Sequence, residues 1–287
     1  MTNTDLTGKN KVLSSSKKKS GSLDIKNITI SFGKGSDKVT AVEDINLSIE
    51  AGSFICILGP SGCGKSTLLN SIAGFVKPTS GNIYLDSKEV NEPGPDRGMV
   101  FQQYSLLPWK TTFENILLGP RLAGDLEATE ISERLLSMVG LSKYRDHYPS
   151  QLSGGMQQRV GLARALATDT DIMLMDEAFS ALDPLIRSDM QKQLLDLQAQ
   201  LKKTIVFITH DLDESLRLGD HIGILNAGKL VQVGTPVDII MNPADDYVEA
   251  FVKDVNRAKV IKAKIIMKPA NEANGIDKSN LIKVQEE

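Results

Sequence analysis

The sequence predicts an α/β fold in which a parallel core sheet lies beside an antiparallel β layer and a helical subdomain. The first observation is a set of continuous apolar runs, which are typical of strands buried on both faces of a parallel sheet. These runs are Phe54–Leu58, Ile172–Met175 and Thr204–Thr209. A helix expected over about 185–201 separates the last two, and this order forms a parallel βαβ unit. The second observation is that residues 23–30 and 41–49 alternate apolar and polar side chains, as half-buried strands do.

The composition is that of a soluble globular protein that can bury a full core without disulfides or metals. Of the 287 residues, 41% are hydrophobic and 24% are charged, and the net charge of -3 argues against a nucleic-acid partner. Cys56 and Cys63 form no disulfide framework and lack the neighbours that a zinc site needs, which indicates a reducing compartment. The N-terminus carries no secretory signal, and no apolar run approaches the length of roughly 18 residues that a membrane span needs. We therefore expect a soluble or peripheral protein.

The chain is expected to divide into one domain and two tails. Residues 1–22 are low in complexity, with three serines followed by three lysines, so we predict a disordered tail. A weak contact of this tail with anionic lipid is the alternative. The domain covers 23–258, with its helical subdomain over about 103–165. Residues 259–287 are Lys-rich and weakly patterned, and we interpret them as a tail or a vestigial linker.

The remaining elements follow from shorter patterns. Ile83–Leu85, after a glycine, indicates a short strand. The middle of the chain, over about 111–167, is predicted to be mostly helical, and Glu127–Val139 is amphipathic with no helix breaker. A hairpin with Gly228 at its turn and a final helix reaching Val252 complete the domain.

The strongest motif follows the apolar strand at 54–58 and precedes an apolar helical stretch over 68–75. It consists of Gly59, Pro60, Ser61, Gly62, Cys63, Gly64, Lys65, Ser66 and Thr67, and it fits the P-loop pattern. Glycines let the backbone N–H groups approach phosphate oxygens, and the helix N-terminus adds a partial positive charge. We expect Lys65 to reach the β- and γ-phosphates and Ser66 to hold Mg²⁺. The alternative is a glycine-rich turn that binds nothing, and the flanking strand and helix argue against it.

Acidic and imidazole side chains follow the next two apolar strands. Asp176 and Glu177 end one strand, and His210 ends the other. Because the carboxyl ends of parallel strands form the ligand crevice, we expect these residues to lie near the phosphate site. Asp176 is then a candidate Mg²⁺ ligand, Glu177 a candidate to orient the attacking water, and His210 a candidate sensor of the γ-phosphate. A solvated strand end and a structural histidine are the alternatives.

The segment Leu152–Arg159, which reads LSGGMQQR, resembles the signature sequence of the ABC ATPases. Ser153 and the two glycines after it open a helix that is expected to run to about Ala167, which creates a second helix N-terminus able to bind an anion. A second such end beside the P-loop would be redundant, so it suits the γ-phosphate of a nucleotide held by a partner chain. We therefore predict a two-fold symmetric dimer, either of two copies or of this chain with a paired ATPase subunit, in which each half completes the other's site.

The resemblance to ABC ATPases covers about 23–252 and implies ATP and Mg²⁺ as ligands. It implies that Phe32 stacks on adenine, that Gln102 links Mg²⁺ to the helical subdomain, and that residues 180–183 cross the dimer seam. The catalytic residues that it implies are Glu177, His210, Lys65 and Gln102. The implied metal ligands are Ser66, Gln102 and Asp176. The implied nucleotide contacts are the P-loop residues together with Phe32, Ser153, Gly154, Gly155, Gln157 and Asp183.

Three longer segments resemble the ATPases of quaternary-amine importers, which take up glycine betaine, proline betaine, choline or related osmoprotectants. They are 152–167, 175–187 and 242–252. The chain ends too soon for the pair of regulatory CBS domains that many members carry, so we expect no ionic-strength sensing of that type. The segment Ser105–Trp109 is instead similar to nitrate, sulfonate and taurine importers. Trp109 is expected either to contact the permease or to fill the core of the helical subdomain.

The resemblance implies an integral membrane permease as partner, an extracytoplasmic solute-binding protein as an indirect partner, and a peripheral place on the cytoplasmic face of the membrane. A non-transport ABC ATPase acting in translation or DNA repair is the remote alternative. Such proteins usually carry two cassettes or a long coiled-coil insert, and this sequence has one P-loop and no such insert. A binding module without hydrolysis is a third possibility, against which Glu177 and His210 argue.

Overall fold

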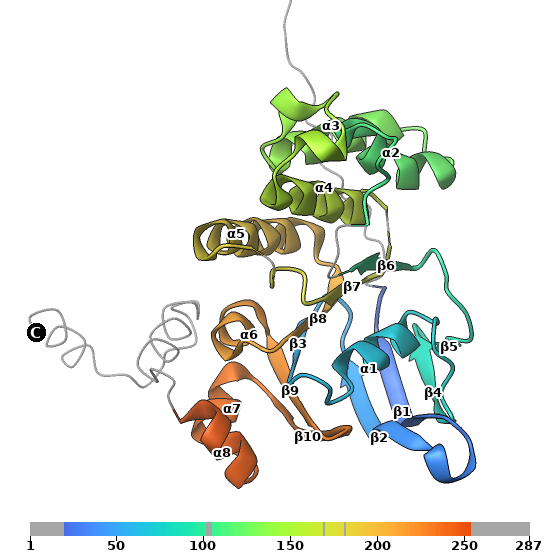
Figure 1. Cartoon of the computed structure of the whole chain (residues 1–287), viewed down its shortest axis with the longest axis vertical. Helices are drawn as coiled ribbons and strands as arrows, with labels where there is room; N and C mark the ends of the chain where they lie inside the picture. The colour runs from blue at the N-terminus through green and yellow to red at the C-terminus, as the bar shows by residue number, and fades with distance from the viewer. Residues whose placement is uncertain (1–19, 102–104, 169, 181, 254–287) are drawn as a thin grey trace, which may run out of the picture.

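The computed structural model describes residues 20–101, 105–168, 170–180 and 182–253. Within these ranges two sheets and a group of helices form the molecule (Figure 1). Residues 1–19 and 254–287 lie outside the described residues, and they include most of the predicted tail at 1–22 and all of the one at 259–287. No described helix is both long enough and apolar enough to cross a bilayer.

The larger sheet of the described structure has six strands in the order β10-β9-β3-β8-β7-β6. The strands are β3 (Phe54–Leu58), β6 (Arg97–Val100), β7 (Ile172–Asp176), β8 (Thr204–Thr209), β9 (His221–Asn226) and β10 (Lys229–Gly234). All neighbours are parallel except the β9–β10 hairpin, which turns at Gly228 as predicted. Every residue of β3 and β8 is buried, so the interpretation of their apolar runs is confirmed. The short edge strand β6 was not predicted, because it begins with Arg and Gly and has only four residues.

The smaller sheet is antiparallel, as the alternating patterns predicted. Its described strands are β2 (Val39–Ile49), β1 (Leu23–Phe32), β4 (Ser80–Leu85) and β5 (Lys88–Glu89), in this spatial order. Helix α1 (Lys65–Ile72) lies between the two sheets, and its Leu68, Leu69 and Ile72 join apolar side chains from both of them in one core. The apolar stretch after the P-loop is therefore the helix that joins the two layers.

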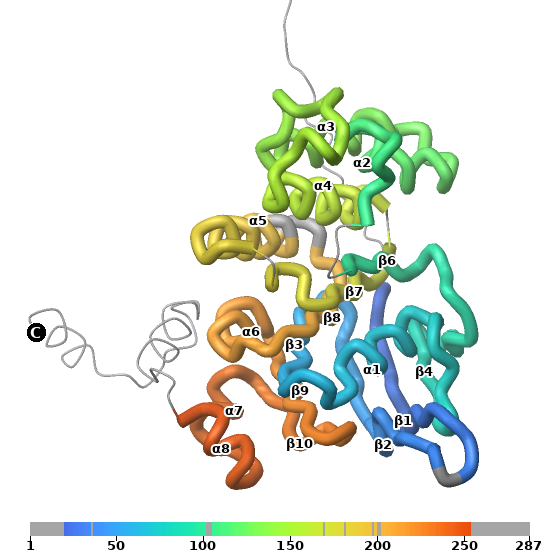
Figure 2. Tube along the Cα trace, viewed as in Figure 1, coloured from blue at the N-terminus to red at the C-terminus, as the bar shows by residue number. Residues whose placement is uncertain are grey.

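The remaining helices form two groups. Helices α2 (Thr112–Leu122), α3 (Ala128–Met138) and α4 (Gly154–Ala167) pack on one another at one end of the molecule (Figure 1). Helices α5 (Pro184–Leu201), α6 (Leu212–Leu218), α7 (Pro236–Met241) and α8 (Asp246–Val252) follow the later strands. The Cα trace in Figure 2 shows α7 and α8 at the opposite side of the molecule from β1 and β4. The predicted helices at 127–139 and 185–201 are confirmed as α3 and α5.

A buried asparagine holds the loop before α2. Asn115 is fully buried, and its side-chain oxygen accepts a hydrogen bond from the backbone N–H of Leu107 at 2.9 Å. Its amide nitrogen donates to the backbone oxygens of Leu107, Lys110 and Thr111 at 3.2, 3.1 and 2.9 Å. Trp109 projects from this loop with 70% of its surface exposed. The alternative in which Trp109 fills the helical core is therefore wrong.

We predict that Asn115→Ala lowers the free energy of unfolding by about 2–3 kcal/mol, because it leaves four partly buried backbone groups of the loop without their partner. Urea denaturation of the purified chain measures this difference. The control is Asn91→Ala at an exposed position outside any helix or strand, which should change stability by less than about 0.5 kcal/mol. Equal midpoints for Asn115→Ala and the parent chain would contradict the assigned role.

Candidate active site

An open pocket of about 360 Å³ lies beside the N-terminus of α1. Its lining residues are Ala41, Ser61, Gly62, Gly64, Lys65, Ser66, Thr67 and Glu177. Most belong to the predicted P-loop, and Glu177 comes from the end of β7. The parallel sheet therefore brings two distant motifs to the same edge, where ligands bind in open α/β sheets.

The loop can follow its path only because glycine occupies its turning points. Gly62 and Gly64 have φ angles of +80° and +105°, which side-chain-bearing residues rarely adopt. A Cβ atom on Gly64 would lie 2.3 Å from the backbone oxygen of Ala41, too close for any side chain. Gly64 is also the N-cap of α1 and offers no side-chain cap. The N-terminus of α1 therefore carries its partial positive charge into the pocket wall.

The ammonium group of Lys65 lies inside the loop. It donates to the backbone oxygens of Gly59 and Pro60 at 2.9 and 3.0 Å, and the residue is only 5% exposed. Its Nζ lies 3.8 Å from Oε1 of Glu177. A buried cation held by neutral carbonyls and one carboxylate suits a site that receives an anion.

Cys63 contributes its backbone to the loop and not its thiol. The side chain is buried in the core between the sheets, and this burial raises the pKa of the thiol. Its backbone oxygen accepts a hydrogen bond from the N–H of Gly228 at 3.0 Å, while the oxygen of Gly228 accepts one from Glu43 at 2.8 Å. The β9–β10 turn thus braces the loop against β2. Both cysteines of the chain are free.

Ser66 lines the pocket, and its hydroxyl oxygen lies beside a carboxylate oxygen of Asp176. The Ser66 hydroxyl donates to Oδ1 of Asp176 at 3.1 Å. Burial is the main cause that raises the pKa of Asp176; the charge of Glu177 adds to it, whereas the Ser66 hydrogen bond and Lys65 oppose it. No cluster of three or more His, Cys, Asp or Glu side chains that could hold a metal ion occurs in the described part of the chain. The two oxygens fit Mg²⁺, which takes few protein ligands and shares the oxygens of a bound phosphate.

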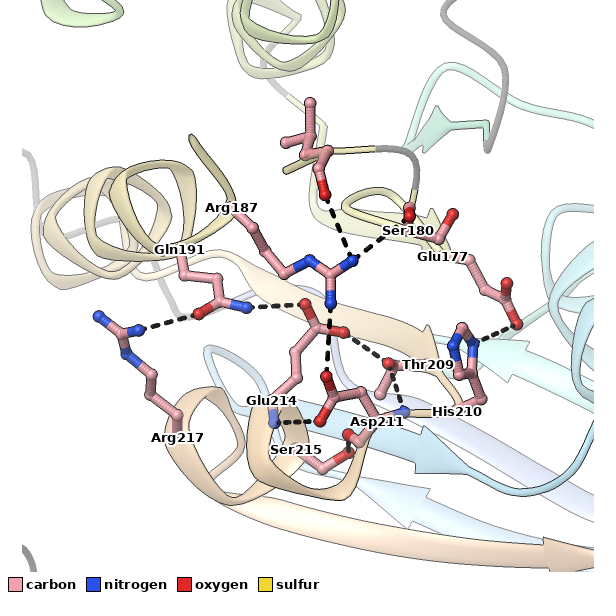
Figure 3. A network of polar contacts seen from close by, with 11 residues as sticks. Glu177, Ser180, Arg187, Gln191, Thr209, His210, Asp211, Glu214, Ser215 and Arg217 are labelled. Carbon is pink, nitrogen blue, oxygen red and sulfur yellow. Dashed lines mark hydrogen bonds and ion pairs between the residues drawn. The ribbon is translucent and has the colours of Figure 1, made fainter. Parts of the chain in front are cut away.

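Glu177 and His210 meet at the same edge of the sheet. Glu177 follows β7 with a φ of +42°, and its N–H donates to the backbone oxygen of Ile208 at 3.0 Å. This turn directs the carboxylate to His210, whose Nδ1 lies 3.4 Å from Oε1 of Glu177 (Figure 3). The same oxygen faces Lys65, so the carboxylate is held between an ammonium group and an imidazole. The expected proximity of the Asp-Glu strand end, His210 and the P-loop is thus observed.

Several predicted ligand residues lie outside this pocket and have structural partners of their own. Ser153 caps α4, because its hydroxyl accepts from the N–H of Met156 at 3.3 Å. Gln157 donates its side-chain amide to the oxygens of Pro149 and Leu152. Asp183 caps α5 through the N–H groups of its second and third residues. None of these three side chains, nor Gly154 or Gly155, lines the pocket of its own chain.

The roles that the resemblance implies for Phe32, as the adenine-stacking aromatic, and for Gln102, as a Mg²⁺ ligand, stay predictions. Phe32 is at the end of β1 and 48% exposed, so its ring is free to contact a ligand. Gln102 lies outside the described residues.

The sequence reasoning missed Ala41, which lines the pocket, as well as Arg187 and Glu214, which flank the His210 segment. A signal for Glu214 existed, since Asp211 and Glu214 have the spacing of a helix cap and its third residue.

Comparisons with known proteins agree with this geometry. The profile of the ABC transporter family matches residues 42–180. The chain is 52% identical over 237 residues to the glycine betaine/carnitine transport ATP-binding protein GbuA of Listeria monocytogenes, covering 79% of this chain and 60% of that protein. It is 43% identical over 224 residues to the nitrate import ATP-binding protein NrtD of Synechococcus elongatus, covering 77% and 81%.

The fold is similar to that of the ATP-binding cassette MJ0796, solved as a dimer in a post-hydrolysis state with ADP and Pi. The TM-score is 0.67 at 35% sequence identity, and the match covers 75% of this chain and 98% of that one. The predicted fold class and the resemblance carried by the motifs are thereby confirmed. The chain spans about three fifths of the length of the glycine betaine relative, with 60% of that protein covered.

We predict that Asp176→Asn raises the melting temperature at about pH 8, because it removes a carboxylate whose burial is unfavourable. The pKa of Asp176 is higher in the folded chain than in the unfolded chain, so parent stability falls as pH rises through the folded-state pKa. The advantage of the variant should therefore shrink towards about pH 4, because protonation of the parent carboxyl removes the buried charge. Differential scanning calorimetry at both pH values measures it.

The control for this prediction is Asp196→Asn on the exposed face of α5, which should change the melting temperature little at either pH. A lower melting temperature for Asp176→Asn at pH 8 would mean that the carboxylate stabilises the fold, contrary to this account.

Proposed function

The chain belongs to the ABC transporter family, and on that premise we propose that it is the ATP-hydrolysing subunit of a membrane importer. One observation carries the proposal. A glycine loop, a buried lysine, a serine hydroxyl and a carboxylate line one pocket, and the serine hydroxyl donates to a second carboxylate, that of Asp176. Each group has a task in the hydrolysis of a nucleoside triphosphate, and the set has no comparable use in a purely structural turn.

The loop from Gly59 to Thr67 would bind the phosphates of ATP. The backbone N–H groups of a glycine-rich loop and the N-terminus of α1 attract phosphate oxygens, and Lys65 adds a full positive charge. Lys65 would exchange its carbonyl partners for the β- and γ-phosphates. Phe32 would stack on the adenine, a contact worth roughly 1–3 kcal/mol.

The oxygens of Ser66 and Asp176 would hold Mg²⁺, with Gln102 as the further ligand implied by the family resemblance. When bound, this ion neutralises charge on the β- and γ-phosphate oxygens. The raised pKa of Asp176 supports this assignment, because a carboxylate in so poorly solvated a place gains most from a bound cation.

Glu177 is the residue that would orient the attacking water. Its carboxylate would accept a hydrogen bond from that water, and the water oxygen would attack the γ-phosphorus as the bond to the leaving ADP breaks. One water proton stays on the inorganic phosphate as its hydroxyl, and the other passes through the carboxylate to solvent. His210 contacts Oε1 of Glu177 at 3.4 Å and would keep the carboxylate directed at the water. Lys65 would stabilise the negative charge that builds up on the transferred group.

We infer that a second copy of the chain completes the site. Ser153 begins α4, which lies with the helical group and not beside α1 (Figure 1). A helix N-terminus at this position is free to meet the γ-phosphate held by another copy. The relative of known structure is a dimer with ADP and Pi, and this supports the same arrangement here.

We further propose that the ATPase works on a permease at the cytoplasmic face of the membrane, with a solute-binding protein outside. A quaternary amine such as glycine betaine is the proposed solute, supported by 52% identity to a glycine betaine/carnitine relative. Nitrate, sulfonate or taurine is the second candidate. It rests on the segment Ser105–Trp109, on the exposed Trp109 and on the nitrate import relative.

We predict that Glu177→Gln retains ATP binding but lowers the hydrolysis rate by about 100-fold or more, because the amide cannot orient and polarise the water as the carboxylate does. With Mg-ATP the variant should accumulate as a dimer, because the ATP that holds the two copies together is no longer hydrolysed. Phosphate release and light scattering coupled to gel filtration measure the two effects. Glu130→Gln, exposed on α3, is the control and should behave as the parent chain.

Adding Ser153→Arg to the Glu177→Gln chain should prevent this dimer and leave binding of a fluorescent ATP analogue to the P-loop largely intact. Ser142→Arg adds the same side chain at an exposed position near the helical group and should not prevent it. Parental hydrolysis by Glu177→Gln would remove Glu177 from its role. Dimerisation unaffected by Ser153→Arg would remove the two-copy site.

The solute is tested by transport in cells. We predict that deleting the gene abolishes uptake of labelled glycine betaine, and that the restored parent gene, but not its Glu177→Gln form, returns it. Uptake of labelled taurine and of nitrate is measured in the same strains. Loss of taurine or nitrate uptake with glycine betaine uptake intact would favour the second candidate.

A further inference from the structure

Arg187 joins the loop before α5 to the strand end that carries His210. It lies in the first turn of α5, and its side chain is half-buried. One terminal nitrogen, Nη2, donates to the backbone oxygens of Ser180 and Leu182 at 3.3 and 3.4 Å. The other, Nη1, lies 3.5 Å from Oδ2 of Asp211 (Figure 3). A single planar guanidinium group thus spans two segments that are far apart in sequence.

The acceptor Asp211 belongs to a network that holds the His210 segment from both sides. Its Oδ1 accepts from the N–H of Glu214 at 3.1 Å and so caps α6, while its own N–H donates to the hydroxyl of Thr209 at 3.0 Å. The hydroxyl of Thr209 donates in turn to the carboxylate of the buried Glu214. His210 stands between Thr209 and Asp211, so its backbone is fixed at both neighbours.

The network ends on α5 and α6. Glu214 accepts a second hydrogen bond from the side-chain amide of Gln191 at 2.8 Å, and Gln191 accepts one from Arg217 at 3.0 Å. Arg217 also donates to the hydroxyl of Ser188. Unlike Arg187, Arg217 makes no described contact with Ser180, Leu182 or Asp211. Replacing Arg187 therefore tests the connection to the loop before α5, and replacing Arg217 tests the rest of the network.

The loop that Arg187 holds leads directly from the catalytic strand. The N–H of Ser180 donates to the backbone oxygen of Glu177 at 3.0 Å, and Asp183 at the end of the loop caps α5. Glu177 is therefore reached from Arg187 by two routes, through Ser180 on one side and through Asp211 and His210 on the other. Arg187 is therefore placed where a shift of this loop would act on both routes.

We propose that Arg187 is a positioning residue that sets the distance and angle between His210 and Glu177 according to the positions of Ser180 and Leu182 in the loop before α5. The inference rests on the proposed function, because that loop is the segment expected to lie at the seam between two copies. A partner that seats the loop then aligns His210 with Glu177. Each contact of Arg187 is 3.3–3.5 Å long and weak alone, so the effect depends on one group bridging three acceptors.

Hydrolysis by the purified full-length chain tests the proposal. We expect Arg187→Met to lower kcat about tenfold with KM for ATP within about twofold, because misplaced catalytic groups cost rate more than substrate binding. The control Arg217→Gln removes an equal charge from the other end of the network and should change kcat less than about twofold. An equal loss of kcat in both variants would assign the effect to the network in general and overturn the proposal.

Arg187→Lys separates charge from geometry. It keeps a cation near Asp211 but cannot span the two carbonyl groups and the carboxylate at once. We expect its kcat to stay within about threefold of that of Arg187→Met. A return to the parental kcat would show that charge alone matters and would contradict the bridging role.

Nuclear magnetic resonance of the histidine rings provides a second measurement. If Arg187 only stabilised the fold, its replacement would leave the ring signal of His210 unchanged. The chain has three histidines, so His210→Gln identifies the ring signal of His210 against those of His147 and His221. We expect Arg187→Met to shift the His210 signal alone and Arg217→Gln to shift none. An unmoved His210 signal in Arg187→Met would overturn the proposal.

The outcomes distinguish the two levels of inference. If the parent chain releases no phosphate from ATP, or if Glu177→Gln hydrolyses it at the parental rate, the proposed function fails. If the parent is active, Glu177→Gln is inactive and Arg187→Met matches the parent in kcat and in its His210 signal, only the role of Arg187 fails.

Discussion

A buried ammonium group held by two backbone carbonyls and one carboxylate is the interaction on which the rest of the structure depends. Lys65 is almost fully buried, and it is balanced by two loop oxygens and by Glu177 at 3.8 Å. Such an arrangement is tolerated only where geometry is well defined, because each unpaired buried charge is costly. The sheet provides that geometry: β8 pairs in parallel with both β3 and β7, so the loop after β3 and the acids at the end of β7 emerge at one edge.

The division of the proposed site between two surfaces follows from the same constraint. The N-terminus of α1 is part of the loop that surrounds Lys65. The N-terminus of α4 lies away from this loop, in the helical group. Ser153 and Asp183 cap their own helices, which fixes the shape of the surfaces that they offer. Arg187 contacts both the segment that ends at Asp183 and Asp211, which follows His210 in the chain. The surface expected at the seam is therefore connected to the pocket through one side chain.

Much of the fold and of the pocket was predictable because its signals are local. Runs of apolar residues, glycines at turning points and acids after a strand each lie within a few consecutive positions, and β3, β7, β8 and α1 were predicted on those grounds. The edge strand β6 carried too short a pattern to be recognised. Trp109 was ambiguous, because an aromatic residue in a helical region serves a core or an interface equally well. In the structure Trp109 is exposed, and Asn115 binds the backbone on either side of it.

By itself, the sequence determined the phosphate loop, the strand-end acids and the second helix N-terminus, since the chemistry of each is contained in one short segment. Only the tertiary structure decided which side chains meet. Ser66 and Asp176 are 110 positions apart, and Arg187 and Asp211 are 24 apart. Contacts of this kind depend on strand register and on the packing of helices over the sheet, where a shift of one residue would turn a side chain to the other face. That dependence is the physical reason why the bridging role of Arg187 could not be seen in the order of residues.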